Sequence, residues 1–553
     1  MAPIKTSSSN ATLAPSPPLK PLSMGPGPIG RRDFLVQDSR AYKQFISKGS
    51  DLEKYIFLSW LRNTNLNMFY RLVLRHLKEV APIIYTPTVA RRAKSTRIST
   101  RSLHRQHHDG LYISLNEVDS IDEIIANYKA SMPEGCCPET TVITDGSRIL
   151  GLGDLGINGM GIPVGKLQLY VAAAGLDPTR CLPIYLEDPL YLGIRQKRPA
   201  DKEFYEATEK VLNGLTRAFP GIFIQFEDFN TPHAFGLLEQ WRDRILCFND
   251  DIQGTGSVIL AGFISAIEHA GIPAKDQRIL FFGAGSAGVG VAKQLVDYLV
   301  IEHHIPESEA KAMFWFVDSR GIITANRGDK LADHKVYFAR TDNGDPTAMI
   351  GLSTIHKAFS EKILRRMNEM NTQARPIIFP LSNPKTKAEC TFEEAMRCTD
   401  NRVLFASGTA FPEYTIPGTN DTRGNNMYVF PPIGLGAKLA RPTSITDTMV
   451  FAVSKALSNT LSDDEIARGE LYPRIERIRE TSAQVAAAFI HQAVREGLAQ
   501  DAYWIDLVKS NPAEGHLSDI PDGTYSQVVL EEVTKAMWAP ADTVNSFISS
   551  TKL

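Results

Sequence analysis

A glycine-rich turn near the middle of the chain restricts the possible folds more than any other stretch. It directly follows the apolar run Ile279–Phe282, and apolar residues at helical spacing come after it. The next strand-like run ends in an acidic residue, Asp318. This order is typical of a dinucleotide-binding βαβ unit, because glycines let the backbone approach a pyrophosphate at the first turn of a helix. We therefore predict a Rossmann-like domain in which Asp318 accepts a hydrogen bond from a ribose hydroxyl; a plain tight turn is the alternative. The predicted cofactor-binding residues of the turn are Gly283, Ala284, Gly285, Ser286, Ala287 and Gly288.

The rest of the chain indicates an α/β protein with several domains. At 553 residues it is too long for one hydrophobic core. From Thr140 onward, strand-like runs alternate with helix-like ones, which favours parallel sheets covered by helices. Helical spacing dominates before that point, where Ser50 and Glu53 form a predicted capping box, and again after about residue 444.

We therefore expect a helical N-terminal region, a central parallel-sheet α/β domain, a Rossmann-like NAD(P)-binding domain and a helical C-terminal region. The expected boundaries are 1–45 for a disordered tail or targeting segment, 46–252 for the substrate domain, 253–510 for the NAD(P)-binding domain and 511–553 for a C-terminal helical extension.

Composition argues against several classes of protein. The 60 basic residues nearly balance the 62 acidic ones, so the net charge of -2 calls for neither nucleic acid nor an anionic membrane as a partner. The chain contains no run of the roughly 18 apolar residues that a membrane span needs. The six cysteines form no CxxC pair, which favours reduced thiols in a soluble, intracellular protein.

Two segments have an unusual composition. Residues 1–32 contain no Asp or Glu and are rich in Ser and Pro, so we expect a disordered tail or a mitochondrial targeting segment. Both the mitochondrion and the cytoplasm therefore remain open as the compartment. Residues 90–109 are strongly basic and lack a periodic apolar face, for which a solvated loop is favoured over a nucleic-acid patch.

Acidic side chains gather at the ends of two strand-like runs. Glu227 and Asp228 end one of them, and Asp250 and Asp251 follow another. Neighbouring strand residues point to opposite faces, so both members of a pair can reach one site only if they lie in a turn. Clustered carboxylates suit Mg2+ or Mn2+. A solvated loop or a helix cap is the alternative, and the residues alone leave that alternative ahead.

Other candidates are ordinary when taken singly. Lys166 ends the string GIPVGK before an apolar helix, and Tyr85 lies in IIYTPTV; alone they would be a surface lysine and a core tyrosine. A second match to GxGxxG, Gly151–Gly156, runs into more glycines and has no later acid. We expect it to be a loop on the substrate side.

Together these strings resemble the malic enzyme family. The strings that occur in the family's order, between about Ser50 and Pro540, are IIYTPTV, TDGSRILGLGDLGINGMGIPVGK, IQFEDF, FNDDIQGTG, FFGAGSAG, PLSNP, LFASG and GNNMYVFP. The resemblance implies oxidative decarboxylation of L-malate to pyruvate and CO2, with NAD or NADP as hydride acceptor and Mg2+ or Mn2+ as metal. It also implies a homotetramer built as a dimer of dimers.

The resemblance further assigns roles to single residues. It implies that Lys166 is the general base for the malate 2-hydroxyl and that Tyr85 is the general acid that protonates C3. Burial beside a metal and an arginine is expected to lower the pKa of this lysine. The implied metal ligands are Glu227, Asp228 and Asp251. The implied substrate-binding residues are Arg148, Asn383, Asn425 and Asn426, and Asn383 is also expected to contact the cofactor.

The choice between NAD and NADP rests on a few side chains. Asp318 favours the free ribose hydroxyl of NAD. Arg320 follows it closely, and Lys335 falls where NADP-preferring relatives carry a phosphate-binding lysine, although both could be surface charges. We expect that both cofactors are used.

Several segments depart from the family's pattern. They are residues 90–109, the connection after Ile184, the region 343–346 and residues 420–424, and Thr231 stands where relatives often place a cofactor-contacting residue. The changes are expected to remove scaffold, including part of a strand and a helix of the Rossmann unit, but no named catalytic residue. Because lost elements leave backbone groups unpaired, a catalytically impaired homologue acting as a regulatory or structural subunit is the alternative. An imperfectly spliced gene would explain the gaps.

Overall fold

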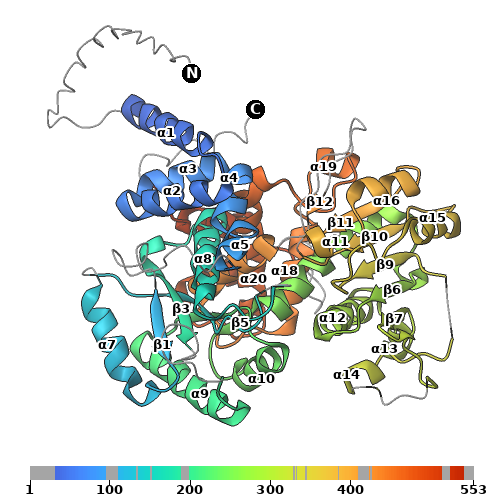
Figure 1. Cartoon of the computed structure of the whole chain (residues 1–553), viewed down its shortest axis with the longest axis horizontal. Helices are drawn as coiled ribbons and strands as arrows, with labels where there is room; N and C mark the ends of the chain where they lie inside the picture. The colour runs from blue at the N-terminus through green and yellow to red at the C-terminus, as the bar shows by residue number, and fades with distance from the viewer. Residues whose placement is uncertain are drawn as a thin grey trace, which may run out of the picture.

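The structure is a computed structural model of the chain. It describes residues 31–94, 110–132, 135–149, 152–187, 198–327, 331, 333–342, 345–383, 385–408, 422–423, 426–513 and 523–540. Two sheets of mainly parallel strands lie on either side of a group of helices that comes from both halves of the chain (Figure 1). The predicted α/β fold class is confirmed.

The first sheet has five parallel strands in the order β1-β3-β2-β4-β5. Its strands are β1 (Leu111–Ser114), β2 (Thr140–Thr144), β3 (Cys181–Glu187), β4 (Phe223–Phe226) and β5 (Cys247–Asn249). Alternate residues point to opposite faces. Ile143 and Ile224 pack with α7 (Ile121–Ser131), α9 (Asp201–Ala218) and α10 (Thr231–Trp241), whereas Val142 and Phe223 belong to the larger core on the other side. Burial on both faces explains why these strands read as continuous apolar runs.

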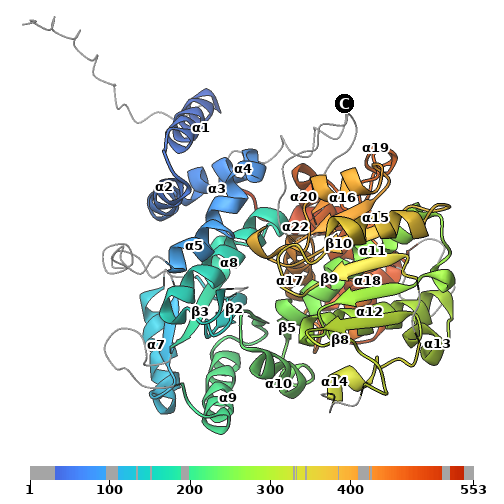
Figure 2. The same ribbon diagram turned by 45° about the vertical axis from the view of Figure 1, so that its right-hand side comes forward.

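The second sheet has the order β12-β11-β10-β9-β6-β7-β8, and all its pairs are parallel except β7 with β8. Its strands β8, β9 and β10 lie on the opposite side of the molecule from β2 and β3 of the first sheet (Figure 2). Its strands are β6 (Ile279–Phe282), β7 (Phe314–Asp318), β8 (Gly321–Ile322), β9 (Ala348–Gly351), β10 (Ile377–Pro380), β11 (Leu404–Ser407) and β12 (Thr422–Arg423). The helices of this domain are α12 (Ser286–His303), α13 (Glu307–Lys311), α14 (Asp333–Val336), α15 (Glu361–Met370) and α16 (Phe392–Cys398). This arrangement is the predicted Rossmann-like domain, with the glycine-rich turn between β6 and α12.

Long apolar helices join the two sheets. They are α8 (Gly161–Ala174), α11 (Thr255–Ala270), α17 (Phe430–Ala440), α18 (Asp447–Ser458) and α20 (Ile478–Arg495). Nearly every residue of α8 and α11 is buried, as expected for helices that are apolar on all sides. Helix α20 packs against both α8 and α18, so the late part of the chain closes the core between the sheets.

Helices also form the N-terminal region, where two expectations need correction. The helices are α1 (Arg31–Ile46), α2 (Asp51–Thr64), α3 (Leu66–Arg75), α4 (Leu77–Ile84) and α5 (Thr88–Lys94). Residues 31–45 of the expected tail form most of α1, which is held in place because buried Asp38 pairs with Arg71 at 3.0 Å. The first residues of the expected loop 90–109 complete α5, where Arg92 donates to the Tyr55 hydroxyl at 2.8 Å. The remainder of that segment lies outside the described residues.

Two other segments that depart from the family's pattern, near β3 and β9, still contain their strands in the part that the structure describes. The strand after Cys181, which was expected to be shortened, is β3; it is the longest of its sheet and pairs with both β1 and β2. Strand β9 likewise pairs with β6 and β10. The C-terminal helices are α19 (Asp463–Ala467), α21 (Ala502–Ser510) and α22 (Gln527–Ala536). Among the described helices, none has the length and apolar content that would let it cross a bilayer.

Candidate active site

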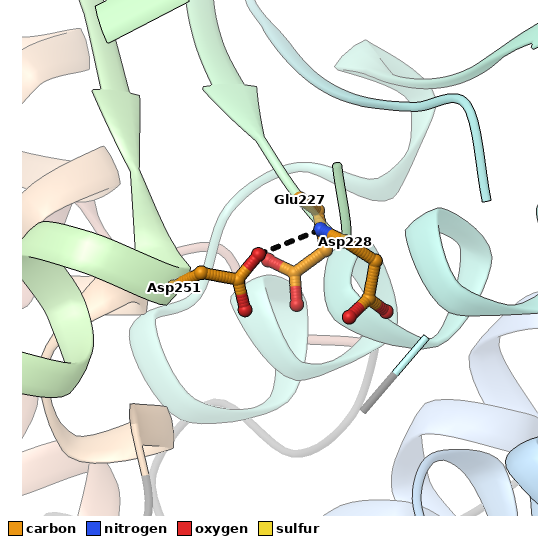
Figure 3. A group of neighbouring side chains, drawn as sticks. All are labelled: Glu227, Asp228 and Asp251. Atoms are coloured by element: carbon orange, nitrogen blue, oxygen red, sulfur yellow. Dashed lines mark hydrogen bonds between the residues drawn. The ribbon is translucent and has the colours of Figure 1, made fainter. Parts of the chain in front are cut away.

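The carboxyl ends of β4 and β5 bring the predicted metal ligands together. The two strands are neighbours, and Phe226 is in register with Asn249, so the residues that follow each strand emerge side by side. Asp228 has a left-handed φ of 56°, and Asp251 lies in the π-helical turn after β5. These turns allow Glu227, Asp228 and Asp251 each to offer an oxygen within 4.8 Å of the others (Figure 3). The Asp228 backbone NH also donates to Asp251 Oδ2 at 2.7 Å.

Negative charge is crowded at this point. Burial raises the pKa of Glu227 well above its ordinary value, Lys166 opposes this shift, and the neighbouring aspartates add to it. Burial and the charge of Asp250 raise the pKa of Asp251 to about 6. A divalent cation among these oxygens would relieve the repulsion, and carboxylate oxygens are the ligands that Mg2+ and Mn2+ prefer. The donor set therefore fits the expected metal.

Lys166 lies on α8 and reaches the same cluster. Its Nζ lies 3.0 Å from Glu227 Oε1 and also contacts Asp250 Oδ2. The ammonium group lies 4.2 Å from the centre of the Phe430 ring at the start of α17. Burial lowers the pKa of Lys166, but Asp250 and Glu227 raise it, and the net direction is well above the ordinary value. The two carboxylates outweigh burial among these side chains. The predicted lowering depends on a bound metal, and it stays a prediction.

Tyr85 directly follows α4 and faces Lys166. Its hydroxyl donates to Glu227 Oε1 at 3.4 Å, and its ring centre lies 5.2 Å from the lysine Nζ. Gly165 permits this approach, because a Cβ there would lie 2.8 Å from both Tyr85 Cδ2 and the Ile84 carbonyl oxygen. Burial raises the pKa of Tyr85 well above its ordinary value, with Lys166 opposing the shift. The phenol therefore keeps its proton near neutral pH and is available as a proton donor.

Arg148 lies in the turn that follows β2. Its backbone NH donates to the Asp228 carbonyl at 3.0 Å, and its guanidinium donates to the Thr231 hydroxyl. Ser147 next to it accepts from the Asn230 backbone NH at 2.8 Å. The turn that carries Arg148 is thereby joined to the start of α10. The altered residue Thr231 holds the predicted substrate-binding arginine.

The predicted asparagines are placed in different ways. Asn426 donates to Asp250 Oδ2 at 3.1 Å and to the Thr255 hydroxyl at 3.0 Å, so it belongs to the cluster around Lys166. Asn425 lies outside the described residues. Asn383 follows β10 in the second sheet, where a Cβ at Gly408 would lie 2.7 Å from its amide nitrogen.

The glycine-rich turn has the close backbone contacts that its sequence predicts. Gly283 has φ of 117°, and a Cβ there would lie 2.6 Å from the Leu352 carbonyl oxygen. A Cβ at Gly288 would collide with the carbonyl oxygen of Gly283. Ala284 is buried, Gly285 precedes α12 and Ser286 begins it, while the side chains of Ser286 and Ala287 are outside the described part. The turn and the start of α12 thus have the arrangement in which a helix N-terminus can bind a pyrophosphate.

Asp318 ends β7 as predicted, but its oxygens are already engaged. Arg327 donates to both of them at 2.8 and 3.0 Å, and Lys335 Nζ lies 3.0 Å from Oδ2. The backbone NH of Arg320 donates to Oδ1 at 2.9 Å. The hydrogen bonds from Arg327 hold the pKa of Asp318 well below its usual range. Arg327 and Lys335 thus pair with the carboxylate that is predicted to accept from a ribose hydroxyl, and that role stays a prediction.

Comparisons with known proteins agree with this geometry. The family profile described as "Malic enzyme, NAD binding domain" matches residues 252–494, and "Malic enzyme, N-terminal domain" matches residues 62–242. The chain is 43% identical over 493 residues to the NADP-dependent malic enzyme of Dictyostelium discoideum, a match that covers 84% of this chain and 88% of that protein.

This chain belongs to the malic enzyme family.

Other malic enzymes are nearly as similar, and they differ in cofactor. The NAD-dependent malic enzyme of Acinetobacter baylyi is 36% identical over 91% of this chain and 88% of its own length. The mitochondrial NAD-dependent malic enzyme of Ascaris suum is 37% identical over 84% of this chain and 75% of its own length. The crystal structure of Entamoeba histolytica malic enzyme is 21% identical, covers 85% of this chain and 95% of that one, and superposes with a TM-score of 0.51, which supports the fold.

Sequence reasoning missed two residues that contact the candidate site residues. Asp250 was recognised only as one of an acidic pair, yet it is the carboxylate that Lys166 and Asn426 both contact. Arg327 was not singled out, although it binds Asp318 through two nitrogens. The Asp-Asp pair at a strand end was a signal that could have identified Asp250. No local pattern indicated Arg327.

Metal affinity in this malic enzyme is expected to fall at low pH. Asp251 is ionised above its raised pKa of about 6 and protonated below it, and a protonated carboxyl is a poor ligand. We expect the dissociation constant for Mn2+, measured by titration calorimetry, to rise by about tenfold per pH unit below that pKa. An affinity that stays constant between about pH 7.5 and about pH 5 would contradict the proposed ligand role.

Proposed function

We propose that the chain oxidises and decarboxylates L-malate to pyruvate and CO2 while reducing NAD(P)+, with Mg2+ or Mn2+ bound by Glu227, Asp228 and Asp251. The observation that carries this proposal is the single buried cluster in which Lys166 contacts Glu227 and Tyr85 donates to the same carboxylate. A catalytically impaired homologue is not favoured, because the acid, the base and the metal carboxylates are assembled together.

Each residue of the cluster has a defined task. Lys166 takes the proton of the malate 2-hydroxyl while hydride passes to the nicotinamide, and contact with Asp250 gives that proton a second acceptor. After CO2 has left, Tyr85 donates its proton to C3 of the enolate. Arg148 binds a substrate carboxylate, because a planar guanidinium can donate two parallel hydrogen bonds to it. When bound, the metal supplies positive charge that lowers the lysine pKa and stabilises the enolate.

A paired assay tests this function. Purified protein with L-malate and Mn2+ is expected to reduce NADP+ or NAD+, which is followed by the absorbance of the reduced cofactor. Pyruvate is then expected in equal amount to the reduced cofactor. Reduction without pyruvate would indicate dehydrogenation without decarboxylation, and no reduction in a well-folded sample would refute the proposal.

We further propose that both cofactors are used and that Lys335 favours NADP. Arg327 and Lys335 together outweigh the charge of Asp318, so a phosphate on the adenosine ribose would meet net positive charge. Hydrogen bonds to charged groups contribute about 1.5–3 kcal/mol. Lys335→Ala is therefore expected to raise KM for NADP by about 10- to 100-fold, with KM for NAD nearly unchanged.

The matched control for this cofactor test is Lys357→Ala, which removes an exposed lysine paired with Glu394. Steady-state kinetics with each cofactor at saturating malate measures both values. An equal loss with NAD and NADP in Lys335→Ala would instead indicate that the lysine acts only by holding Asp318.

The assembly and the compartment are proposed on the family likeness. We expect a homotetramer formed as a dimer of dimers, which light scattering after size-exclusion chromatography would test. The compartment is either the mitochondrion or the cytoplasm, and a fluorescent fusion would distinguish them.

A further inference from the structure

Glu389 is a buried carboxylate without a described cation partner. It lies between β10 and α16, and its exposed fraction is 0%. Oε1 accepts from the backbone NH of Ser353 at 3.0 Å and from the hydroxyls of Ser353 and Ser382 at 2.8 and 2.5 Å. Oε2 accepts from the backbone NH of Ser382 at 3.3 Å. A buried charge is costly unless such donors replace water, so four donors on one carboxylate make a strong link.

The link joins two loops at the carboxyl edge of the second sheet. Ser353 follows β9 and Ser382 follows β10, strands that are paired in parallel up to Gly351 and Pro380. The Thr354 backbone NH also donates to the Ser382 hydroxyl at 2.8 Å. The ends of both strands are thus held by one side chain from a third segment.

The loop after β9 borders the glycine-rich turn, and the loop after β10 carries Asn383, a predicted cofactor contact. The backbone of Leu352 and Ser353 lies against Gly283, the first glycine of the turn, since a Cβ at Gly283 would lie 2.6 to 2.9 Å from their atoms. On the other loop, Ser382 immediately precedes Asn383. Glu389 therefore links the loop that borders the glycine-rich turn to the loop that carries Asn383.

We propose that Glu389 is a positioning residue for NAD(P), which fixes the loops after β9 and β10 so that the cofactor binds in one geometry. The proposal rests on the proposed function only in taking this edge as the NAD(P) site. Glutamine is nearly the same size but replaces an acceptor with an NH2 group that faces donors. Glu389→Gln would leave one of the two backbone NH groups poorly paired, because the amide keeps a single oxygen. Displacement of a site by about 1 Å can lower rates by about 100-fold.

The matched control is Glu465→Gln. Glu465 is also buried, with an exposed fraction of 1%, and accepts from the backbone NH groups of Ser462 and Arg474, each at 2.8 Å, and from the Ser462 hydroxyl at 3.0 Å. It also pairs with the Arg477 guanidinium, so its loss is expected to lower Tm at least as much as the loss of Glu389. None of these donors belongs to the cofactor turn or to the loops after β9 and β10. Glu389→Gln and Glu465→Gln are both expected to lower Tm. Thermal unfolding of the two variants therefore shows how much of any change comes from a loss of stability alone.

Fluorescence titration with NADPH, and with NADH, measures cofactor binding in the absence of malate. We expect Glu389→Gln to weaken binding by about 10-fold or more and to raise KM for the cofactor, with KM for malate changed by less than about 2-fold. Glu465→Gln is expected to bind as the unmodified protein does. Equal cofactor binding in all three proteins would overturn the proposal.

Two milder variants keep the test decisive if Glu389→Gln does not fold. Ser353→Ala and Ser382→Ala each remove one hydroxyl donor and retain the backbone donor, and we expect each to weaken NADPH binding by about 3- to 10-fold. Unchanged binding in both would overturn the proposal. If the unmodified protein binds neither NADPH nor NADH, the proposed function fails, an outcome that is distinct from failure of the positioning role.

Discussion

Replacing Lys166 with alanine is expected to lower kcat by about 100- to 10,000-fold, the usual contribution of a general base. The group acts on a proton that moves only as the reaction proceeds, so kcat and kcat/KM should fall together while KM for malate changes little. Alanine also leaves Asp250 and Glu227 without their cation. Breaking a buried ion pair in this way destabilises proteins by about 3–5 kcal/mol, so a lower Tm is expected as well.

Replacing Lys166 with arginine distinguishes the loss of a general base from a loss of folding stability. Lys166→Arg keeps a positive charge beside the two carboxylates, but a guanidinium does not give up its proton at neutral pH. We therefore expect a protein with near-normal Tm and with activity as low as that of the alanine variant. Lys455→Ala is a suitable control, because it removes another partly buried lysine paired to a carboxylate, Glu302 at 2.6 Å. Substantial activity in Lys166→Arg would show that a different group is the base.

The second large effect is expected for Asp251→Asn. The amide retains an oxygen that can accept from the Asp228 backbone NH, so the local turn is preserved. It removes one of three negative charges from the metal site. Loss of a residue that only supports a metal ligand weakens affinity by about 10- to 100-fold, and loss of a ligand should exceed that range. We expect activity to fall by a similar factor at low Mn2+ and to recover partly at high Mn2+.

Thermal unfolding gives this metal prediction an independent readout. Without added metal, Asp251→Asn should unfold at or above the temperature of the unmodified protein, because it relieves repulsion among buried carboxylates. Added Mn2+ should raise Tm of the unmodified protein, since a ligand that binds only the folded state stabilises it, and should raise that of the variant far less. Asp243→Asn, a change at an exposed aspartate on the same domain, is the control. Equal Mn2+-induced shifts in both variants would contradict a ligand role for Asp251.

The predictions from sequence succeeded where a local pattern determines geometry. The glycine turn after Ile279–Phe282 indicated a βαβ unit, and strands, turn and helix occur at those positions. The two acidic pairs left a shared metal site and a solvated loop both open, and the left-handed φ of Asp228 provides one of the turns that a shared site requires. Such features depend on residues close together in the chain, so they can be read before the tertiary structure is known.

Sequence patterns could not predict the contacts that distant segments make with one another. The direction of the Lys166 pKa depends on two carboxylates brought to it by β4 and β5, and no spacing within the chain reports that balance. The engagement of Asp318 by Arg327 depends on how the segment after β8 folds back. Helix α1 was taken for a tail because its stability comes from packing and from the pair between Asp38 and Arg71, rather than from its own composition.

The contacts of Lys166 with late parts of the chain have a consequence for the timing of activity. Phe430 and Asn426 close one side of the cluster, yet both are synthesised long after Lys166 and Asp250. We therefore expect a nascent chain to show no malate turnover until these two residues have been added, although it already carries Tyr85, Lys166 and the three carboxylates.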